Sequence, residues 1–138
     1  MSTDHNKAIA RNHYQNTRNL EAAFELISPN VVFQALPGLP PTYEGWKQGH
    51  AMFLGAFPDQ QVTIEDEIAE GDTVVTRWTF SGTHQGALMG IPATGKHVAV
   101  KGISVDRIGD GKVVEHLAQI DMVSLMQQLG AIPAPQTA

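Results

Sequence analysis

The sequence predicts an α+β fold in which three helices cover the concave face of a curved antiparallel sheet. Helical spacing of apolar residues occurs mainly in the first 56 residues. From residue 62 onward, β-branched residues dominate in four blocks that are separated by turn-forming residues. Helices that precede a run of hairpin-connected strands must cover one face of the sheet, and a strongly curved sheet then leaves a cone-shaped hollow.

Two helical segments open the chain. Apolar residues within 4–15 have the spacing of a moderately amphipathic helix. Asn19 is placed to cap a second helix over 20–27, and the Ser-Pro-Asn sequence at 28–30 is expected to end it. A short strand is expected to follow at 31–34.

A loop and a third helix lie before the sheet-forming part of the chain. Residues 37–41 read Pro-Gly-Leu-Pro-Pro, which cannot continue a helix or a central strand. Because this loop is apolar, we expect it to lie against a pocket or an interface. The third helix is predicted over 46–56.

The remaining chain predicts four long antiparallel strands and a last helix. Turn-forming residues at 70–72 and 109–111, and a longer connection at 85–96, separate these strands. A short amphipathic helix over 122–129, followed by Gly130, puts Asp121 at a strand-to-helix junction. The predicted strands are 62–69, 73–83, 98–108 and 112–121.

Length and composition limit the possible organisation. The chain has 138 residues, 42% hydrophobic and 17% charged, which suits one globular domain with a core and an internal pocket. We therefore expect a single domain over 1–138, with residues 131–138 as a flexible tail.

Several classes of function are not expected from the composition. The absence of cysteine excludes disulfides, thiolate catalysis and cysteine-ligated metals. The six histidines show no pair at zinc-ligand spacing, so we expect no metal. The net charge of −5 with scattered basic residues argues against nucleic acid. Neither a membrane span nor an apolar signal core is apparent, so we expect no membrane association and a cytoplasmic location.

A series of short motifs runs through most of the chain. They lie at 57–59 (Phe-Pro-Asp), 62–66, 71–79, 82–86, 90–95, 110–116 and 128–130. In order and spacing, these motifs resemble the SnoaL-like polyketide cyclase family, which belongs to the nuclear-transport-factor-2-like superfamily of cone-shaped α+β barrels. The resemblance implies the hollow inferred above.

The resemblance also implies an activity and a catalytic residue. Characterised members of the family close a ring of a polyketide ester by a cofactor-free intramolecular aldol condensation, with an aspartate at the end of the last strand as acid and base. Alignment on His116 and on 128–130 puts this aspartate at Asp121. Ser104 and Gly102 stand where the cyclases have a histidine and a glutamine, and 117–120 replaces a run rich in tryptophan and acid.

Two roles are open for Asp121. If strand alternation turns Leu117, Gln119 and Asp121 toward the hollow, desolvation raises the pKa of the carboxyl toward the range useful for proton transfer. Alternatively, Asp121 caps the helix over 122–129 by accepting a backbone N–H bond, a role in which aspartate is strongly preferred.

Other side chains are candidates for substrate binding. Gln34, Ser104 and Gln119 can orient a substrate if they face inward, because a buried amide or hydroxyl needs a partner. The histidines at 116 and 84 can transfer protons or bond neighbouring backbone. Aromatic residues suited to line the hollow, or to pack in the core, are Trp78, Trp46, Phe33 and Tyr43.

The leading functional hypothesis is a cofactor-independent enzyme that uses Asp121 to move a proton at a carbon next to a carbonyl, on a small hydrophobic, polyketide-like or cyclic molecule. A lyase, isomerase or hydratase on the same scaffold and a non-catalytic binding module are the alternatives. The exposed face of the sheet predicts a homodimer.

Overall fold

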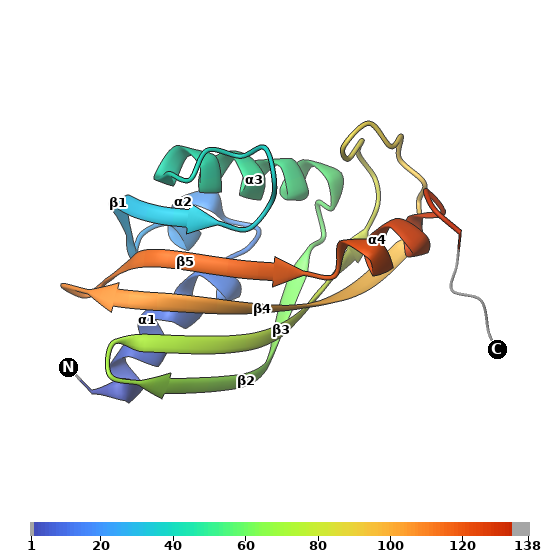
Figure 1. The fold of residues 1–138 in the computed structure, drawn as a ribbon. Helices are drawn as coiled ribbons and strands as arrows, with labels where there is room; N and C mark the ends of the chain where they lie inside the picture. The colour runs from blue at the N-terminus through green and yellow to red at the C-terminus, as the bar shows by residue number, and fades with distance from the viewer. Residues whose placement is uncertain (1, 134–138) are drawn as a thin grey trace.

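A curved five-stranded sheet with helices on its concave side forms the framework of the protein (Figure 1). The computed structural model describes residues 2–133. Of the predicted tail, 131–133 are exposed and belong to no helix or strand, and 134–138 lie outside the described residues. The helices are α1 (Thr3–Gln15), α2 (Leu20–Ala23), α3 (Tyr43–Ala56) and α4 (Met122–Leu129). The strands are β1 (Ile27–Gln34), β2 (Gln61–Glu70), β3 (Thr73–Thr83), β4 (His97–Gly109) and β5 (Lys112–Ile120).

The strand order is β1-β5-β4-β3-β2. The four strands β2 to β5 pair antiparallel, as predicted, whereas β1 joins the edge of the sheet parallel to β5. Helix α1 contacts β2, β3, β4 and β5, and α3 packs on β1 (Figure 1). These contacts confirm the predicted α+β architecture with helices over the concave face.

The predicted second helix over 20–27 is too long. Helix α2 ends at Ala23, and residues 27–30 belong to β1. Ile27 is buried in the core and pairs with Val113 of β5. Pro29 is tolerated because β1 is an edge strand whose register shifts between Ile27 and Val32. Pairing with a distant strand therefore overrides the local helical pattern.

Helix α3 begins three residues earlier than predicted. Thr42 is its N-cap, and the Thr42 hydroxyl accepts a hydrogen bond from the backbone N–H of Gly45 at 3.2 Å. The preceding Pro-rich loop lies against the hollow, as expected, because Leu39 lines it.

The hairpin between β4 and β5 contains a bulge that sets the orientation of β5. Asp110 and Gly111 both have positive φ (52° and 76°), as a two-residue hairpin turn requires. Ile108 pairs with Val113, but Arg107 pairs with Glu115, so one extra residue of β5 has no partner. The residues that face inward therefore change from odd to even numbers along β5 after this point.

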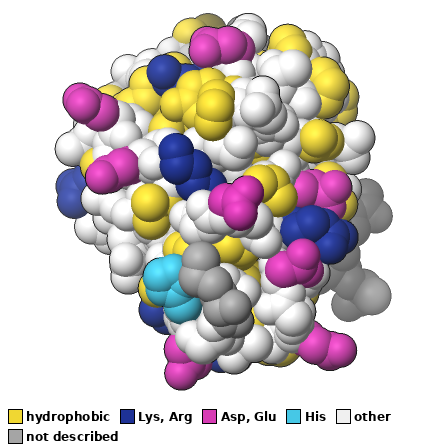
Figure 2. All heavy atoms as spheres, turned by 90° about the vertical axis from the view of Figure 1, so that its left-hand side faces the viewer, with side chains coloured by type: hydrophobic (Ala, Val, Ile, Leu, Met, Phe, Trp, Pro, Cys, Tyr) yellow, Lys and Arg dark blue, Asp and Glu magenta, His cyan; other side chains and the backbone are white. Residues whose placement is uncertain are grey.

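Surface charge is mixed. Figure 2, which views the end of the molecule that carries the N-terminus, shows acidic and basic side chains interspersed with apolar ones. None of the helices within residues 2–133 has the length and hydropathy needed to cross a bilayer. The same residues contain no group of three or more histidine, aspartate or glutamate side chains that could hold a metal ion.

Candidate functional site

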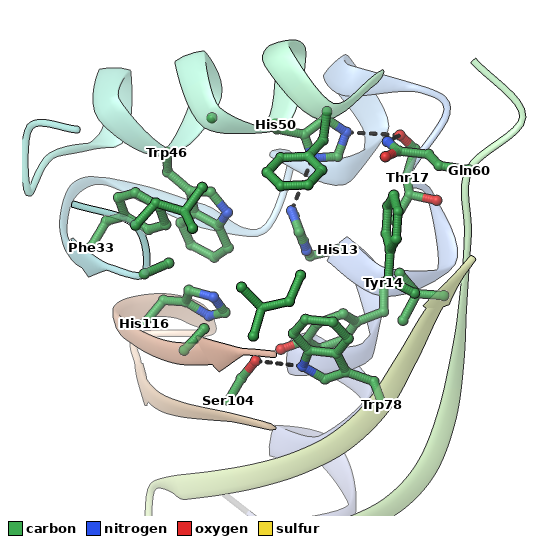
Figure 3. Close-up of a pocket in the computed structure, with 18 of the residues that line it drawn as sticks. His13, Tyr14, Thr17, Phe33, Trp46, His50, Gln60, Trp78, Ser104 and His116 are labelled. Carbon is green, nitrogen blue, oxygen red and sulfur yellow. Dashed lines mark hydrogen bonds between the residues drawn. The ribbon is translucent and has the colours of Figure 1, made fainter. Parts of the chain in front are cut away.

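A largely apolar hollow of about 130 Å³ lies between the helices and the concave face of the sheet (Figure 3). This volume is about ten times what one water molecule needs, so the hollow is a ligand-sized space. Its side chains come from α1, α3 and all five strands. The aromatic and polar side chains of the lining include His13, Tyr14, Thr17, Phe33, Trp46, His50, Gln60, Trp78, Ser104 and His116. Ala118 and Ile120 of β5 also line it.

A buried pair of a histidine and an aspartate lies at the hollow: His116 lines it, and Asp106 lies beside His116 outside the lining. Asp106 of β4 and His116 of β5 are register partners, and Nδ1 of His116 lies 2.6 Å from Oδ1 of Asp106. Their side chains are 3% and 6% exposed. A carboxylate only accepts hydrogen bonds, so Nδ1 carries the proton and Nε2 of a neutral ring carries the lone pair. No described residue hydrogen-bonds Nε2.

Aromatic stacking holds the His116 ring in place. Its centroid lies 4.1 Å from that of the Trp46 ring, with an interplanar angle of 16°. Phe33 lies nearly parallel to the same imidazole at 6.0 Å. The ring is thus fixed by packing as well as by its bond to Asp106, which is the arrangement that a positioned base requires.

Two hydroxyl groups lie beside this pair. The Tyr14 hydroxyl donates to Oδ2 of Asp106 at 3.4 Å. Burial, followed by the negative charge of Asp106, raises the pKa of Tyr14 well above its usual value, so the phenol stays protonated and remains a donor. The Ser104 hydroxyl accepts from Nε1 of Trp78 at 2.7 Å, which leaves its own proton for another acceptor.

Gly102 makes room for the Trp78 indole. A Cβ atom at this position would lie 2.3 Å from Cη2 of Trp78. Only glycine therefore lets the indole lie against β4 and reach Ser104. The two departures from the family pattern noted on this strand, at Gly102 and Ser104, thus belong to one local arrangement with Trp78.

A pair of histidines, His13 and His50, also lines the hollow, and the centroid of the His13 ring lies 6.3 Å from that of His116. His13 Nε2 lies 3.2 Å from His50 Nδ1, and His50 Nε2 lies 2.8 Å from the carbonyl oxygen of Thr17 (Figure 3). Gln60 donates to the same carbonyl at 2.7 Å. Because a carbonyl only accepts, His50 Nε2 donates to Thr17. In a neutral His50 ring Nδ1 then accepts, and His13 Nε2 donates to it.

The pKa directions agree with these tautomers. Burial is the main cause that lowers the pKa of His13 well below its usual value, and the neighbouring His50 and His116 lower it further. Burial also lowers the pKa of His50, against the opposing effect of the Thr17 carbonyl. Both side chains thus resist protonation in the folded protein.

We expect the protein to lose stability as the pH falls below about 6.5. Unfolded histidines bind protons there, whereas folded His13 and His50 stay neutral, so each contributes a slope of up to about 1.4 kcal/mol per pH unit. His13→Gln, which keeps a donor toward His50, should reduce this slope in urea unfolding measured from pH 7.5 to 5. His5→Gln, at an exposed position of the same helix, is the matched control. An unchanged slope in His13→Gln would contradict the assignment.

The structure separates the predicted substrate-binding residues into two groups. Trp78, Ser104 and His116 line the hollow. Gln34 and Gln119 are exposed and do not belong to its lining. The inward orientation considered for these two amides is therefore corrected, because alternation along β1 and β5 turns their neighbours Phe33, Ala118 and Ile120 toward the hollow instead.

Asp121 lies at the predicted junction but outside the hollow. It is exposed and is the N-cap of α4, where its Oδ1 accepts from the backbone N–H of Ser124 at 3.0 Å. It borders a shallow groove on the outer side of the sheet together with Lys101. The face of β5 that lines the hollow carries His116, Ala118 and Ile120, so the inward orientation considered for Leu117, Gln119 and Asp121 is corrected.

The other aromatic and histidine candidates have separate roles. Trp46 and Phe33 line the hollow, whereas Tyr43 packs edge-on against Phe24 outside it. His84 is fully buried, and its Nδ1 accepts from the backbone N–H of Thr94 at 3.1 Å. His84 thus holds the connection between β3 and β4, which is the structural role considered for it.

Sequence reasoning missed four residues of the site: Asp106, Tyr14, His13 and His50. Asp106 had a usable signal, because it is in phase with the buried Val98 and Val100 of β4. No sequence signal pointed to the pair of His13 and His50, because the two residues are 37 positions apart and come together only through packing of α1 and α3.

Comparison with known proteins supports the fold and the family. The chain is 36% identical over 76 residues to aklanonic acid methyl ester cyclase DnrD of Streptomyces peucetius, and the match covers 54% of this chain and about half (52%) of DnrD. The structure of AclR, a proposed hydroxylase of Streptomyces galilaeus, has a TM-score of 0.89 at 31% identity, over 99% of this chain and 87% of that one.

Two further findings concern the fold and the family. An NTF2-like protein of Burkholderia thailandensis shares the fold, with a TM-score of 0.72 at 21% identity over 94% of this chain and 98% of that one. The family model for SnoaL-like polyketide cyclases matches residues 7–129. With nearly its whole length matched, this chain belongs to the SnoaL-like polyketide cyclase family.

Proposed function

We propose that the protein catalyses cofactor-independent proton transfer at a carbon next to a carbonyl, in the aldol-type cyclisation of a small polyketide-like or cyclic molecule. The observation that carries this proposal is His116, which lines an apolar hollow and is hydrogen-bonded to the buried Asp106. Membership in the family and the partial match to an ester cyclase support a cyclase-type enzyme.

In the proposed reaction, Nε2 of His116 takes the proton from the carbon, and the electron pair of the C–H bond moves onto the carbonyl oxygen. The hydroxyl of Ser104, whose own proton is left for another acceptor, donates a hydrogen bond to the enolate oxygen that forms. The enolate carbon then attacks a second carbonyl of the same molecule, and His116 returns its proton to the new alkoxide. Asp106 stabilises the imidazolium between the two steps.

Asp121 is the competing candidate for the base, as the family resemblance implies. Support for His116 comes from the surroundings of the two residues. His116 lines the hollow, whereas Asp121 is exposed and holds the N-terminus of α4. The Asp121 carboxylate accepts a hydrogen bond from the backbone of α4 and does not line the hollow, so it is not placed to take a proton from a molecule bound there.

The proposal is tested by carbon-bound hydrogen exchange. The protein is incubated in D₂O with a panel of aromatic β-keto esters, and the loss of the α-proton signal is followed by ¹H NMR, with mass spectrometry for ring closure. We expect exchange faster than in a protein-free blank. A parallel panel of epoxides and hydroxy-ketones separates a lyase, isomerase or hydratase. Binding without any exchange or product would overturn the proposal in favour of a binding module, which the apolar lining also suits.

The proposed partner of the protein is a second copy of the chain. Four apolar residues lie in one register row across the outer face of the sheet, with Ile68 opposite Val75, Val75 opposite Val105, and Val105 opposite Leu117. Ile68 is 65% exposed. A large exposed side chain in a continuous apolar row favours association.

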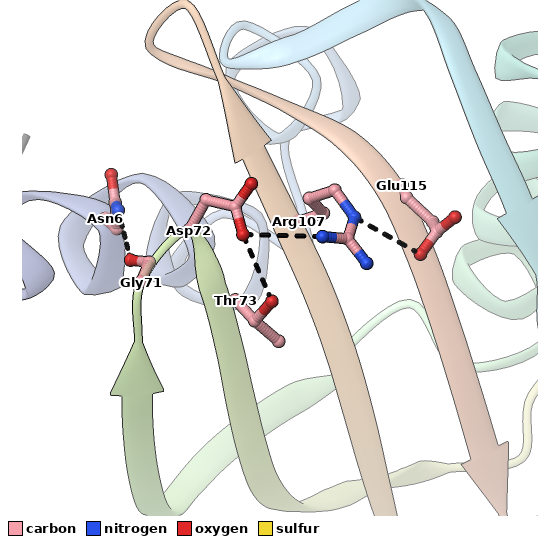
Figure 4. A network of polar contacts seen from close by, with 6 residues as sticks. All are labelled: Asn6, Gly71, Asp72, Thr73, Arg107 and Glu115. Atoms are coloured by element: carbon pink, nitrogen blue, oxygen red, sulfur yellow. Dashed lines mark hydrogen bonds and ion pairs between the residues drawn. The ribbon is translucent and has the colours of Figure 1, made fainter.

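Ion pairs on both sides of this row favour a symmetric contact. On one side Arg77 bonds Asp66 at 2.6 Å. On the other, Arg107 lies 3.4 Å from Asp72 and 3.8 Å from Glu115 (Figure 4). A two-fold axis through the row would pair it with itself and bring arginines of one copy to acids of the other.

We expect the protein to be a dimer in light scattering at micromolar concentration. Val105→Glu, at the centre of the row, should give a monomer, because it would bury two unpaired carboxylates at the contact. Val123→Glu, at an exposed position of α4 (61%), is the matched control and should remain dimeric. A monomeric wild-type protein would contradict this prediction.

A further inference from the structure

A polar groove adjoins the hollow at one end. It lies between the turn that joins α1 to α2 and the start of β2, and has a volume of about 400 Å³. Figure 3 shows Tyr14, Thr17 and Gln60 together at this end of the hollow. Residues that line both the groove and the hollow are Tyr14, Thr17, Gln60 and Val62.

The groove and the hollow differ in chemistry. The lining of the hollow is mainly aromatic and aliphatic and includes no lysine, arginine, aspartate or glutamate. The rest of the groove is amide-rich with one cation: Gln15, Asn16, Arg18, Asn19 and Gln61. Because no carboxylate lines the groove, its charge is positive although the chain carries a net charge of −5.

Arg18 is unusual among the four arginines of the chain. Arg11, Arg77 and Arg107 all form ion pairs with carboxylates. Arg18 is exposed and forms no ion pair with any residue between 2 and 133. A guanidinium beside amide donors, with no acid of its own, is suited to bind a carboxylate.

The turn that carries Arg18 is fixed. Asn12 donates to the carbonyl of Ala22 at 2.8 Å, and Asn16 donates to the carbonyl of Asn12 at 2.7 Å. The carbonyl of Thr17, next to Arg18, accepts from both His50 and Gln60. Arg18 therefore extends from a backbone that is tied to the wall of the hollow.

We propose that this groove is a second subsite, which binds the carboxylate on a side arm of a molecule whose aromatic body occupies the hollow. The substrate class is thus an aromatic molecule with an acidic arm. This inference rests on the proposed function, since it names the substrate class of the same site.

The test compares 4-(2-naphthyl)butyrate with its methyl ester, which has the same body but no charge. The only two tryptophans, Trp46 and Trp78, both line the hollow, so quenching of their fluorescence reports its occupancy. We expect the acid to bind about fivefold more tightly than the ester, as an exposed ion pair allows. Raising the salt concentration from 50 to 500 mM should remove this difference.

Two variants test whether Arg18 causes the difference in affinity between the acid and the ester. Arg18→Gln should lower the affinity for the acid to that of the ester and leave the affinity for the ester unchanged. Lys96→Gln removes one positive charge at an exposed position of the connection between β3 and β4, outside the linings of the groove and the hollow, and should change neither affinity. Equal binding of acid and ester to the wild type, an equal effect of both variants, or binding of neither probe would overturn the subsite. Binding is measured without turnover, so a lack of hydrogen exchange bears on the proposed function alone.

Discussion

Replacement of His116 by asparagine is expected to lower the rate of carbon-bound hydrogen exchange by about a thousandfold, which lies within the range for removal of a general base. The asparagine amide can occupy the position of Nδ1 and donate to Asp106, so the buried carboxylate keeps its partner. What the variant loses is Nε2, the nitrogen that no described residue hydrogen-bonds. The loss should appear in kcat far more than in KM, because the walls of the hollow remain.

Asp121→Asn is the comparison that decides between the two candidate bases. An asparagine is also a good N-cap, so α4 should remain folded, and exchange should stay within about threefold of the wild type, since Asp121 lies outside the hollow. The unfolding transition of each variant shows whether it is folded. Loss of exchange in Asp121→Asn with retention in His116→Asn would assign the base to Asp121 instead.

Gly45→Ala is expected to destabilise the protein by about 3 kcal/mol, near the upper end for overpacking. A Cβ atom on Gly45 would lie 1.8 Å from the backbone oxygen of Pro40, in the loop that packs on α3. A backbone atom cannot move aside as a flexible side chain can, so the loop must shift. Leu36 and Leu39 of this loop line the hollow, and the variant should therefore also bind ligands more weakly.

Gly55→Ala is the matched control on the same helix. Its Cβ would meet nothing within 4 Å, and alanine favours a helix over glycine, so this variant should be more stable by about 0.5 kcal/mol. Urea unfolding measures both values. Similar effects of the two substitutions would show that the Pro40 contact does not limit stability.

Elements with strong local signals could be predicted from the sequence. Strand β3 and helix α4 have the predicted bounds, and Asp121 lies at the predicted junction. Local chemistry is sufficient there, because an acid that caps a helix and a glycine that ends it, here Gly130 with φ 79°, act within a few residues. The length of α2 could not be predicted, since the pairing of β1 with β5 decides it.

The candidate site, too, could be predicted from the sequence only in part. The sequence by itself determined which polar residues the strands carry, including Ser104 and His116, and the turn that joins β4 to β5. Only the tertiary structure decided which of them meet. A single bulge residue after Val113 changes the phase of β5, so His116 lines the hollow and meets Asp106, whereas Asp121 is exposed. The position of one unpaired residue depends on packing of the whole sheet, and side-chain alternation alone does not contain it.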